Sequence, residues 1–229
     1  MSNEQEYNEG VTENTLTRQE RLDTTALRLL TYGKPADTCL IDGQAFPTGQ
    51  LGNMAGRFHF QLLDRIWYAS EYLYLCGEWS LKTDICIEAQ KYVLMMKSGA
   101  WAYRYSKAKY KKHIRPDFPT FRLQWMLWCV WQKCQLNQAR KVGQKHYPDQ
   151  CFANLLMSVP DDVVIAEVEN NDPVWATRAN ESGHLCGGNA MGKILTICRR
   201  HLLNGTAPAI DTDLLNASDI HILGKRIQF

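Results

Sequence analysis

The stretch FRLQWMLWCVWQKCQL, residues 121–136, decides the fold class of this 229-residue chain. Its apolar side chains recur on every side of a helix, with three tryptophans spaced three residues apart. A helix that is apolar all round is buried within protein. Its uncharged part, residues 123–132, is bracketed by Arg122 and Lys133 and is shorter than the roughly 20 residues that span a bilayer. The stretch therefore predicts the core helix of a soluble domain.

The segments around this helix predict more helices than strands. Helical spacing and breakers predict helices over residues 70–77, 84–96, 99–112, 150–157 and 189–203. Alternation and β-branched content predict strands over residues 58–68, 163–168 and 220–222, and residues 24–32 fit a short helix or a strand. We therefore expect an α+β fold, one mostly helical domain over residues 24–229 around a few short strands. The polar residues 1–23 predict a mobile tail.

Composition limits the class of protein. Hydrophobic residues make up 45% and charged residues 22% of the chain, which excludes a wholly disordered, collagen-like or purely coiled-coil protein. No basic N-terminus leads into an apolar run, so we expect a cytoplasmic protein whose eight cysteines are reduced thiols. No cysteine pair has C-x-x-C spacing and no H-E-x-x-H occurs, so we expect no metal and no other cofactor.

The positive charge is concentrated in one basic stripe, residues 104–115 (RYSKAKYKKHIR). Residues 1–24 contain six acidic and two basic residues, a net charge of −4, which leaves +6 for the rest of a chain whose net charge is +2. The stripe alone supplies six positive charges: Arg104, Lys107, Lys109, Lys111, Lys112 and Arg115. Basic residues interleaved with tyrosines suit a nucleic-acid backbone, although a solvated helix face fits the same pattern.

Two sites carry candidate chemistry. Gly187 and Gly188 directly precede a predicted helix, and a glycine turn at a helix N-terminus presents N–H groups to an anion. An ordinary glycine turn is the simpler alternative. In the segment WYASEY, residues 67–72, Glu71 follows Ser70 among aromatic residues at a strand-to-helix turn. Ser70 is the expected N-cap. Desolvation would suit Glu71 to acid–base work, whereas a first-turn glutamate also simply favours the helix dipole.

These residues resemble the NADAR family. The run VENNDPVW at residues 168–175, followed by GGNAMGKILTICR at residues 187–199, is similar to the family's C-terminal signature. Upstream, LGNM at residues 51–54 and WYASE at residues 67–71 are similar to its L-S-N-F and W-P-T-S-E motifs. The motifs occur in the family's order and cover roughly residues 51–203.

The resemblance implies an N-glycosidase that cleaves a ribose–nitrogen bond, in ADP-ribosylated guanine of nucleic acid or in a phosphoribosylated intermediate of riboflavin synthesis. It implies that Glu71 is the catalytic carboxylate beneath C1′. Asp172 then holds ribose hydroxyls or assists proton transfer to the leaving nitrogen. It also implies a set of substrate-binding residues, aromatic ones for the base and backbone ones for phosphate: Asn53, Trp67, Phe118, Trp175, Gly187, Gly188 and Asn189.

The chain departs from the family at several places, among them Gly52 and Met54, which replace the serine and phenylalanine of L-S-N-F. Glu78 stands where the family has a pocket lysine, and Phe118 stands where it usually has a tryptophan. Aligning instead on the EAQK run at residues 88–91 would place Asp84 at the catalytic position. We prefer Glu71 because it keeps WYASE and its distance from Asn53. The expected partners are a nucleotide or ADP-ribosyl substrate, with DNA or RNA on the basic stripe and no membrane. The alternative function is a non-catalytic nucleic-acid-binding module that uses the same stripe.

Overall fold

The computed structural model describes a large central part of the chain and a few flanking segments. These are residues 20–22, 28–32, 39–41, 44–46, 50–56, 58–136, 141–142, 145–146, 151–160, 163–169, 172–179, 181 and 185–229. The expected mobile tail, apart from its last residues 20–22, lies outside the described residues. No helix among the described residues is long and apolar enough to cross a membrane.

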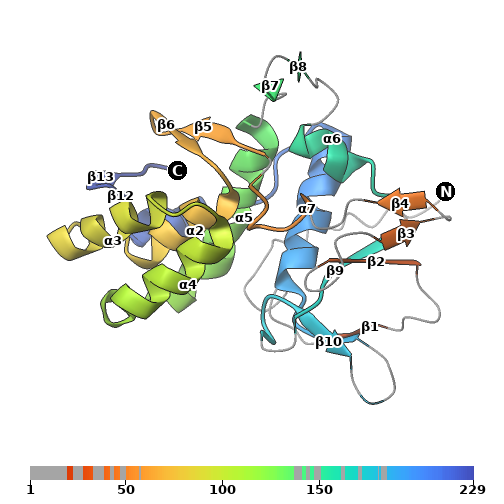
Figure 1. The fold of residues 1–229 in the computed structure, drawn as a ribbon, viewed down its shortest axis with the longest axis horizontal. Coiled ribbons are helices and arrows are strands. Elements are labelled where there is room, and N and C mark those ends of the chain that lie inside the picture. The colour runs from red at the N-terminus through yellow and green to blue at the C-terminus, as the bar shows by residue number, and fades with distance from the viewer. Residues whose placement is uncertain are drawn as a thin grey trace.

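Helices form most of the fold. They are α2 (Ser70–Glu78), α3 (Asp84–Leu94), α4 (Gly99–Tyr110), η2 (Lys111–His113), α5 (Phe118–Leu136), α6 (Phe152–Met157), α7 (Ala190–Asn204) and α8 (Thr212–Ala217). In Figure 1, α2 to α5 gather on one side, and α7 lies between this group and the strands β2 and β9. The expected α+β fold with mainly helical content is confirmed.

Helix α5 is the centre of the core, as its sequence predicts. Trp125, Leu127 and Cys129 are wholly buried, and the helix packs against α2 on one side and α7 on another. It begins earlier than expected, at Phe118, with Pro119 in its first turn. Proline is tolerated there because the first N–H groups of a helix have no intrahelical acceptor. Pro119 therefore fits the first turn of α5.

The strands are short and form several small sheets. They are β1 (Glu20–Leu22), β2 (Arg28–Tyr32), β3 (Cys39–Ile41), β4 (Gln44–Phe46), β5 (Phe60–Leu62), β6 (Arg65–Trp67), β7 (Lys141–Val142), β8 (Lys145–His146), β9 (Val163–Glu167), β10 (Thr177–Ala179), β11 (Leu185–Gly187), β12 (His221–Ile222) and β13 (Lys225–Arg226). Strand β2 pairs in parallel with β9, and β11 lies between β1 and β10. Helix α7 packs on β9, which places the end of β9 beside the start of the helix.

Three expected boundaries were wrong. Residues 58–68 form the hairpin β5–β6 instead of one strand, because Leu63 and Asp64 both have positive φ and reverse the chain. The supposed tail residues 20–22 form β1, whose backbone pairs with β11. Between the predicted strand at residues 163–168 and the predicted helix at residues 189–203, where the sequence predicts no element, the chain forms β10 and β11.

Candidate active site

Glu71 lies in the first turn of α2 and is almost completely buried. Asn53 Nδ2 donates a 2.5 Å hydrogen bond to Glu71 Oε2, and the Glu71 backbone N–H donates to the Asn53 carbonyl at 3.1 Å. Burial raises the pKa of Glu71 from 4.5 to about 8, and the neighbouring charges of Glu78 and Glu167 act in the same direction, while the Asn53 bond opposes them. Glu71 is therefore mainly protonated at neutral pH.

The loop before the β5–β6 hairpin holds the start of α2. The Asn53 carbonyl also accepts a 3.3 Å bond from Ser70 Oγ. The expected capping role of Ser70 was wrong, because Ala69 is the N-cap and Ser70 is the first helical residue. The other amide atom of the Asn53 side chain, Oδ1, is buried and has no hydrogen-bond partner among the described residues. Asn53 thus positions Glu71, and its Oδ1 is an unused hydrogen-bond acceptor beside the carboxyl group.

Glu167 interacts electrostatically with Glu71, and Asp172 interacts with Glu167. Glu167, at the end of β9, has its pKa raised to about 8 by burial and by the charges of Asp172 and Glu169. Asp172 Oδ1 accepts bonds from the backbone N–H groups of Val174 at 3.2 Å and Trp175 at 3.0 Å, so this carboxylate shapes its own turn. The charge of Glu167 raises the pKa of Glu71, and the charge of Asp172 raises the pKa of Glu167. These interactions connect the two expected catalytic residues.

The start of α7 does not match the expected phosphate cradle. The N–H groups of Gly188 and Asn189 donate to the carbonyls of Pro173 (2.8 Å) and Ala176 (3.3 Å). The next two N–H groups of the helix donate to carbonyls of the same turn. A Cβ on Gly187 or Gly188 would lie 2.4 or 2.6 Å from carbonyl oxygens of the turn. These glycines therefore allow close backbone packing, and the N–H group of Gly188 is used within the turn; their expected role in phosphate binding stays a prediction.

Asn189 and Trp67 are structural as well. The Asn189 side chain accepts from Glu167 N–H at 3.1 Å and donates to the Ile165 carbonyl at 2.9 Å, so it ties α7 to β9. Trp67 is wholly buried, and its indole N–H donates to the Leu62 carbonyl at 2.9 Å within the hairpin. Both side chains therefore hold parts of the fold together, and their expected role in substrate binding stays a prediction.

The other expected aromatic residues meet through Tyr74, which lies one turn after Glu71 on α2. The Tyr74 ring contacts Trp175 edge-on at 5.5 Å between centroids and contacts Phe118 at 5.4 Å. Burial, together with the charges of Glu78 and Glu71, raises the pKa of Tyr74 well above its usual value. The structure thus brings Phe118 and Trp175 into one aromatic group on the face of α2 that carries Glu71.

Glu78 lies at the other end of this face and is paired with a lysine from α4. Lys107 Nζ lies 2.5 Å from Glu78 Oε1, and the Glu78 side chain is only 4% exposed. Burial raises the pKa of Glu78, and the charges of Lys107 and Arg122 oppose the rise. The position at which the resemblance implies a pocket lysine therefore holds a buried carboxylate with a cation brought from α4.

The basic stripe does not form one surface. Lys107 turns inward to Glu78, and Arg115 is 4% exposed. The Arg115 guanidinium donates to Asp117, to Ser80 Oγ and to the Ser218 carbonyl, so it anchors the C-terminal segment. Both side chains therefore bind groups of the protein itself, and the nucleic-acid role expected for them stays a prediction. Lys109 pairs with Glu88 at 3.5 Å on an exposed surface. The remaining members are exposed: Arg104, Lys111 and Lys112.

Sequence reasoning missed Tyr74, Tyr103 and Glu167 as neighbours of the site. Burial and the charges of Glu71, Glu78 and Asp172 raise the pKa of Tyr103, so this exposed ring on α4 lies near all three carboxyl groups. Residues three and seven positions after Glu71 share its side of a helix, and this spacing signals Tyr74 and Glu78. No local signal identifies Tyr103 or Glu167, because tertiary packing brings them to the site.

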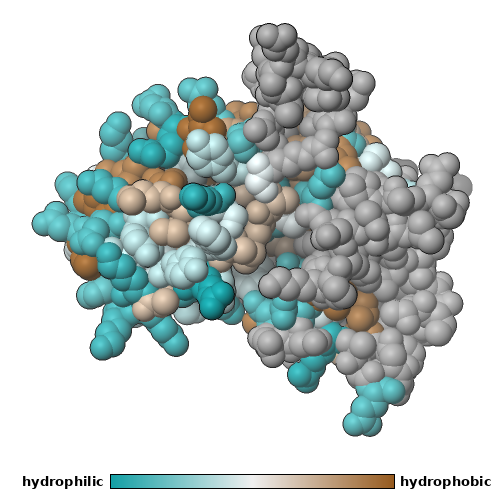
Figure 2. Space-filling model, viewed as in Figure 1, coloured by the Kyte–Doolittle hydropathy of each residue, from teal (hydrophilic) through white to brown (hydrophobic). Residues whose placement is uncertain are grey.

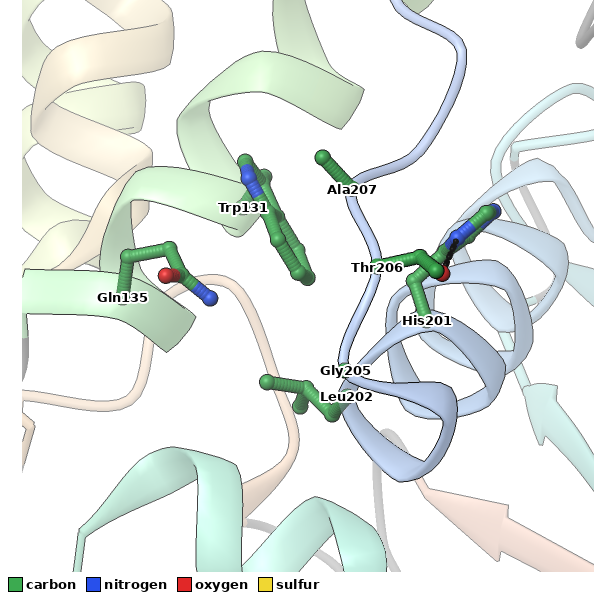
Figure 3. A pocket seen from close by; sticks show the side chains of 7 residues that line it. All are labelled: Trp131, Gln135, His201, Leu202, Gly205, Thr206 and Ala207. Carbon is green, nitrogen blue, oxygen red and sulfur yellow. Dashed lines mark hydrogen bonds between the residues drawn. The ribbon is translucent and has the colours of Figure 1, made fainter.

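A separate cavity of about 360 Å³ lies at the far end of α7 (Figure 3). It is lined by Trp131 and Gln135 of α5 and by residues at and beyond the end of α7: His201, Leu202, Gly205, Thr206 and Ala207. None of the expected site residues lines it. Within the described part of the chain, no group of three histidine, cysteine or acidic residues is arranged to hold a metal ion.

The comparisons with known proteins give one match. No family model matches the chain, and no curated protein matches it. The structure is similar to the NMR structure of the Escherichia coli protein YbiA, a NADAR family member, with a TM-score of 0.53 and 17% sequence identity. The match covers 78% of this chain and 86% of that chain. The fold is NADAR-like. At 17% identity the likeness concerns the fold alone.

Proposed function

We propose that this protein is an N-glycosidase that hydrolyses the bond between ribose C1′ and a nitrogen atom. The observation that carries the proposal is Glu71, a buried carboxyl group held by Asn53, whose pKa is raised to about 8 by burial. A carboxyl group whose pKa lies near the working pH is suited to proton transfer. The NADAR-like fold agrees with this chemistry.

The proposed reaction needs one proton donor and one water molecule. Glu71 donates its proton to the leaving nitrogen while the C1′–N bond breaks and its electron pair stays on the nitrogen. The carboxylate left behind faces a positively charged ribosyl centre and stabilises it. Water then adds to C1′ and gives a proton to Glu71, which restores the acid. Atoms and charge balance, with free base and free ribosyl group as products.

Neighbouring groups supply binding and orientation in this proposal. Asp172 holds the ribose hydroxyls with the oxygen that does not shape its turn, and the Tyr74–Trp175 pair supplies aromatic surface for the base. The candidate substrates are ADP-ribosylated guanine in nucleic acid and phosphoribosylated aminopyrimidines. Both contain a ribose–nitrogen bond to a heteroaromatic base or its amino group.

Product analysis tests the proposal. The purified full-length protein is incubated with ADP-ribosylated DNA and, separately, with a phosphoribosyl aminopyrimidine, and the products are separated by chromatography. We expect free base or amine together with the ribosyl product. We expect Glu71→Gln to lower turnover by about 10²–10⁴-fold. Glu88→Gln, at an exposed position on α3, is the matched control and should retain wild-type turnover.

A second candidate function is nucleic-acid binding without catalysis. It is favoured by exposed aromatic and basic residues on α4 and η2: Trp101, Tyr103, Tyr105, Arg104, Lys111 and Lys112. Figure 2 shows mainly hydrophilic side chains along the left-hand edge, where α3 and α4 lie. Salt-sensitive binding of single-stranded DNA without product release would favour this function over hydrolysis.

A further inference from the structure

Lys133 of α5 is a wholly buried lysine without an acidic partner. Its side chain has no exposed surface, and no carboxylate among the described residues acts on its charge. A buried ammonium without a counter-ion destabilises a fold, and an apolar side chain of the same length would fill the same space without that cost. Core packing therefore does not explain why a lysine stands at this position.

Three segments that are far apart in the sequence meet at the Lys133 ammonium. Its Nζ lies 3.9 Å from the centre of the Phe152 ring, at the start of α6, and 5.7 Å from the centre of the Phe58 ring. The two rings contact each other edge-on at 5.3 Å between centroids. The third contact is polar, because Lys133 Nζ donates a 3.4 Å hydrogen bond to the Gly52 carbonyl. The rings attract the cation, and its hydrogen bond is directed at Gly52.

Gly52 begins the turn that contains Asn53. The Ala55 N–H donates to the same Gly52 carbonyl at 3.1 Å, which closes a four-residue turn with Asn53 as its second residue. Asn53 Nδ2 donates to Glu71 Oε2, and the Asn53 carbonyl accepts from the Glu71 N–H. A continuous chain of contacts thus leads from Lys133 through one turn to Glu71.

We propose that Lys133 is a positioning residue, which fixes the turn at Gly52 from which Asn53 holds the catalytic carboxyl group. The inference rests on the proposed N-glycosidase function. Among the described residues, no hydrogen bond or charge interaction joins Lys133 to Glu71 directly, so Lys133 acts through the turn. An apolar residue at this position leaves the Gly52 carbonyl with one donor instead of two, and the turn can then draw Asn53 away from Glu71.

This role has a measurable consequence for the pKa of Glu71. The Asn53 hydrogen bond lowers this pKa, against the larger effect of burial, which raises it to about 8. Loosening the turn weakens the bond, so the pKa should rise further. The charged groups that act on Glu71 stay unchanged when Lys133 is replaced, and they are Glu78 of α2, Glu167 of β9 and Lys107 of α4.

NMR titration of the side-chain carboxyl groups tests the inference. The full-length protein is labelled with ¹³C-glutamate, and the Glu71→Gln variant identifies the Glu71 signal by its absence. Lys133→Met and Lys133→Leu remove the donor with two apolar side chains of different shape, and in both we expect the pKa of Glu71 to rise by about 1. Lys82→Met, at an exposed position, is the matched control and should leave this pKa unchanged.

A double variant separates an effect through the turn from a direct effect of charge. In Asn53→Ala the side-chain hydrogen bond to Glu71 is already absent, so adding Lys133→Met should raise the pKa of Glu71 no further. An equal rise with and without Asn53, an unchanged pKa in the two apolar variants, or failure of both to fold would overturn the inference.

Kinetics distinguish this role from the proposed function itself. Lys133→Met should lower kcat for hydrolysis by roughly 10- to 100-fold with KM nearly unchanged, because it displaces the reacting carboxyl group and leaves substrate binding intact. The titration needs no substrate, so a wild-type protein that releases no base would contradict only the proposed hydrolysis. Hydrolysis with an unchanged kcat in Lys133→Met would contradict only the role of Lys133.

Discussion

Replacing Glu71 with glutamine should make the protein more stable at neutral and alkaline pH. In the folded protein the pKa of Glu71 is raised from 4.5 to about 8, mainly by burial. Between these two values the folded state holds a proton that the unfolded state has released. The stability that this proton confers is complete below pH 4.5 and is lost as the pH rises toward 8. Glutamine keeps the size and the polar oxygen of the side chain, and because it does not titrate, the variant does not lose this stability as the pH rises.

The size of the effect follows from the width of that pH interval. Each pH unit inside it changes the free energy of unfolding by about 1.4 kcal/mol for one titrating group. From about pH 5.5 to about pH 7.5, the wild type should therefore lose about 3 kcal/mol that the variant does not lose. Glu167 has its pKa raised to a similar value and titrates in both proteins, so it enters the comparison only through its interaction with Glu71.

Urea unfolding of the wild type and of Glu71→Gln across this pH range measures the difference directly. The free energy of unfolding of the variant should exceed that of the wild type by an amount that grows steadily as the pH rises. The enzymatic activity of the variant should be lost over the whole pH range. Glu88→Gln is the control, because Glu88 is exposed and its stability difference from the wild type should stay flat. If wild type and Glu71→Gln lose stability in parallel, Glu71 is not protonated at neutral pH and its role as an acid is refuted.

Four other variants test separate parts of the structure. Gly188→Ala places a Cβ 2.6 Å from a turn carbonyl oxygen and should cost about 1–3 kcal/mol in a urea melt; a neutral result would disprove the tight packing of this turn. Burial lowers the pKa of Lys133 from 10.5 to about 7, so its charge costs most stability below pH 7 and Lys133→Met should raise the melting temperature more at about pH 6 than at about pH 9. Arg115→Ala should cost roughly 3 kcal/mol, because it leaves buried partners unpaired, and should not change the salt dependence of DNA binding. The double variant Lys111→Ala and Lys112→Ala should weaken DNA binding and flatten its salt dependence without loss of stability. If Arg115→Ala flattened the salt dependence and the double variant did not, the basic stripe would have to bind DNA as one continuous surface.

The helices could be predicted from sequence because their signals are local. Thr83 and Ser98 cap α3 and α4 with their side-chain oxygens, and the apolar residues of α5 mark it as buried. The β5–β6 hairpin could not be predicted, since Leu63 and Asp64 adopt positive φ without the glycine or asparagine that usually signals such a turn.

The site could be predicted only in part. The aromatic surroundings of Glu71 in the sequence single it out as a candidate. Its raised pKa, however, depends on burial by groups that are far away in sequence. Gly188 correctly indicates a turn. Its N–H group donates to the Pro173 carbonyl and is therefore not available to an anion, and only the tertiary structure shows this contact. The same holds for Lys107. Its place among six basic residues in residues 104–115 suggests a surface position, but its side chain turns inward to the buried Glu78.

The most direct test of the central claim is hydrolysis in water labelled with ¹⁸O. The full-length protein and the Glu71→Gln variant are given ADP-ribosylated DNA, and the released ribosyl product is analysed by mass spectrometry. Cleavage of the C1′–N bond by water predicts free base together with one ¹⁸O atom at C1′ of the ribosyl product from the wild type, and almost none from the variant. Absence of labelled product from the wild type, or equal labelling from both proteins, would contradict the assignment of Glu71 as the group that carries N-glycoside hydrolysis.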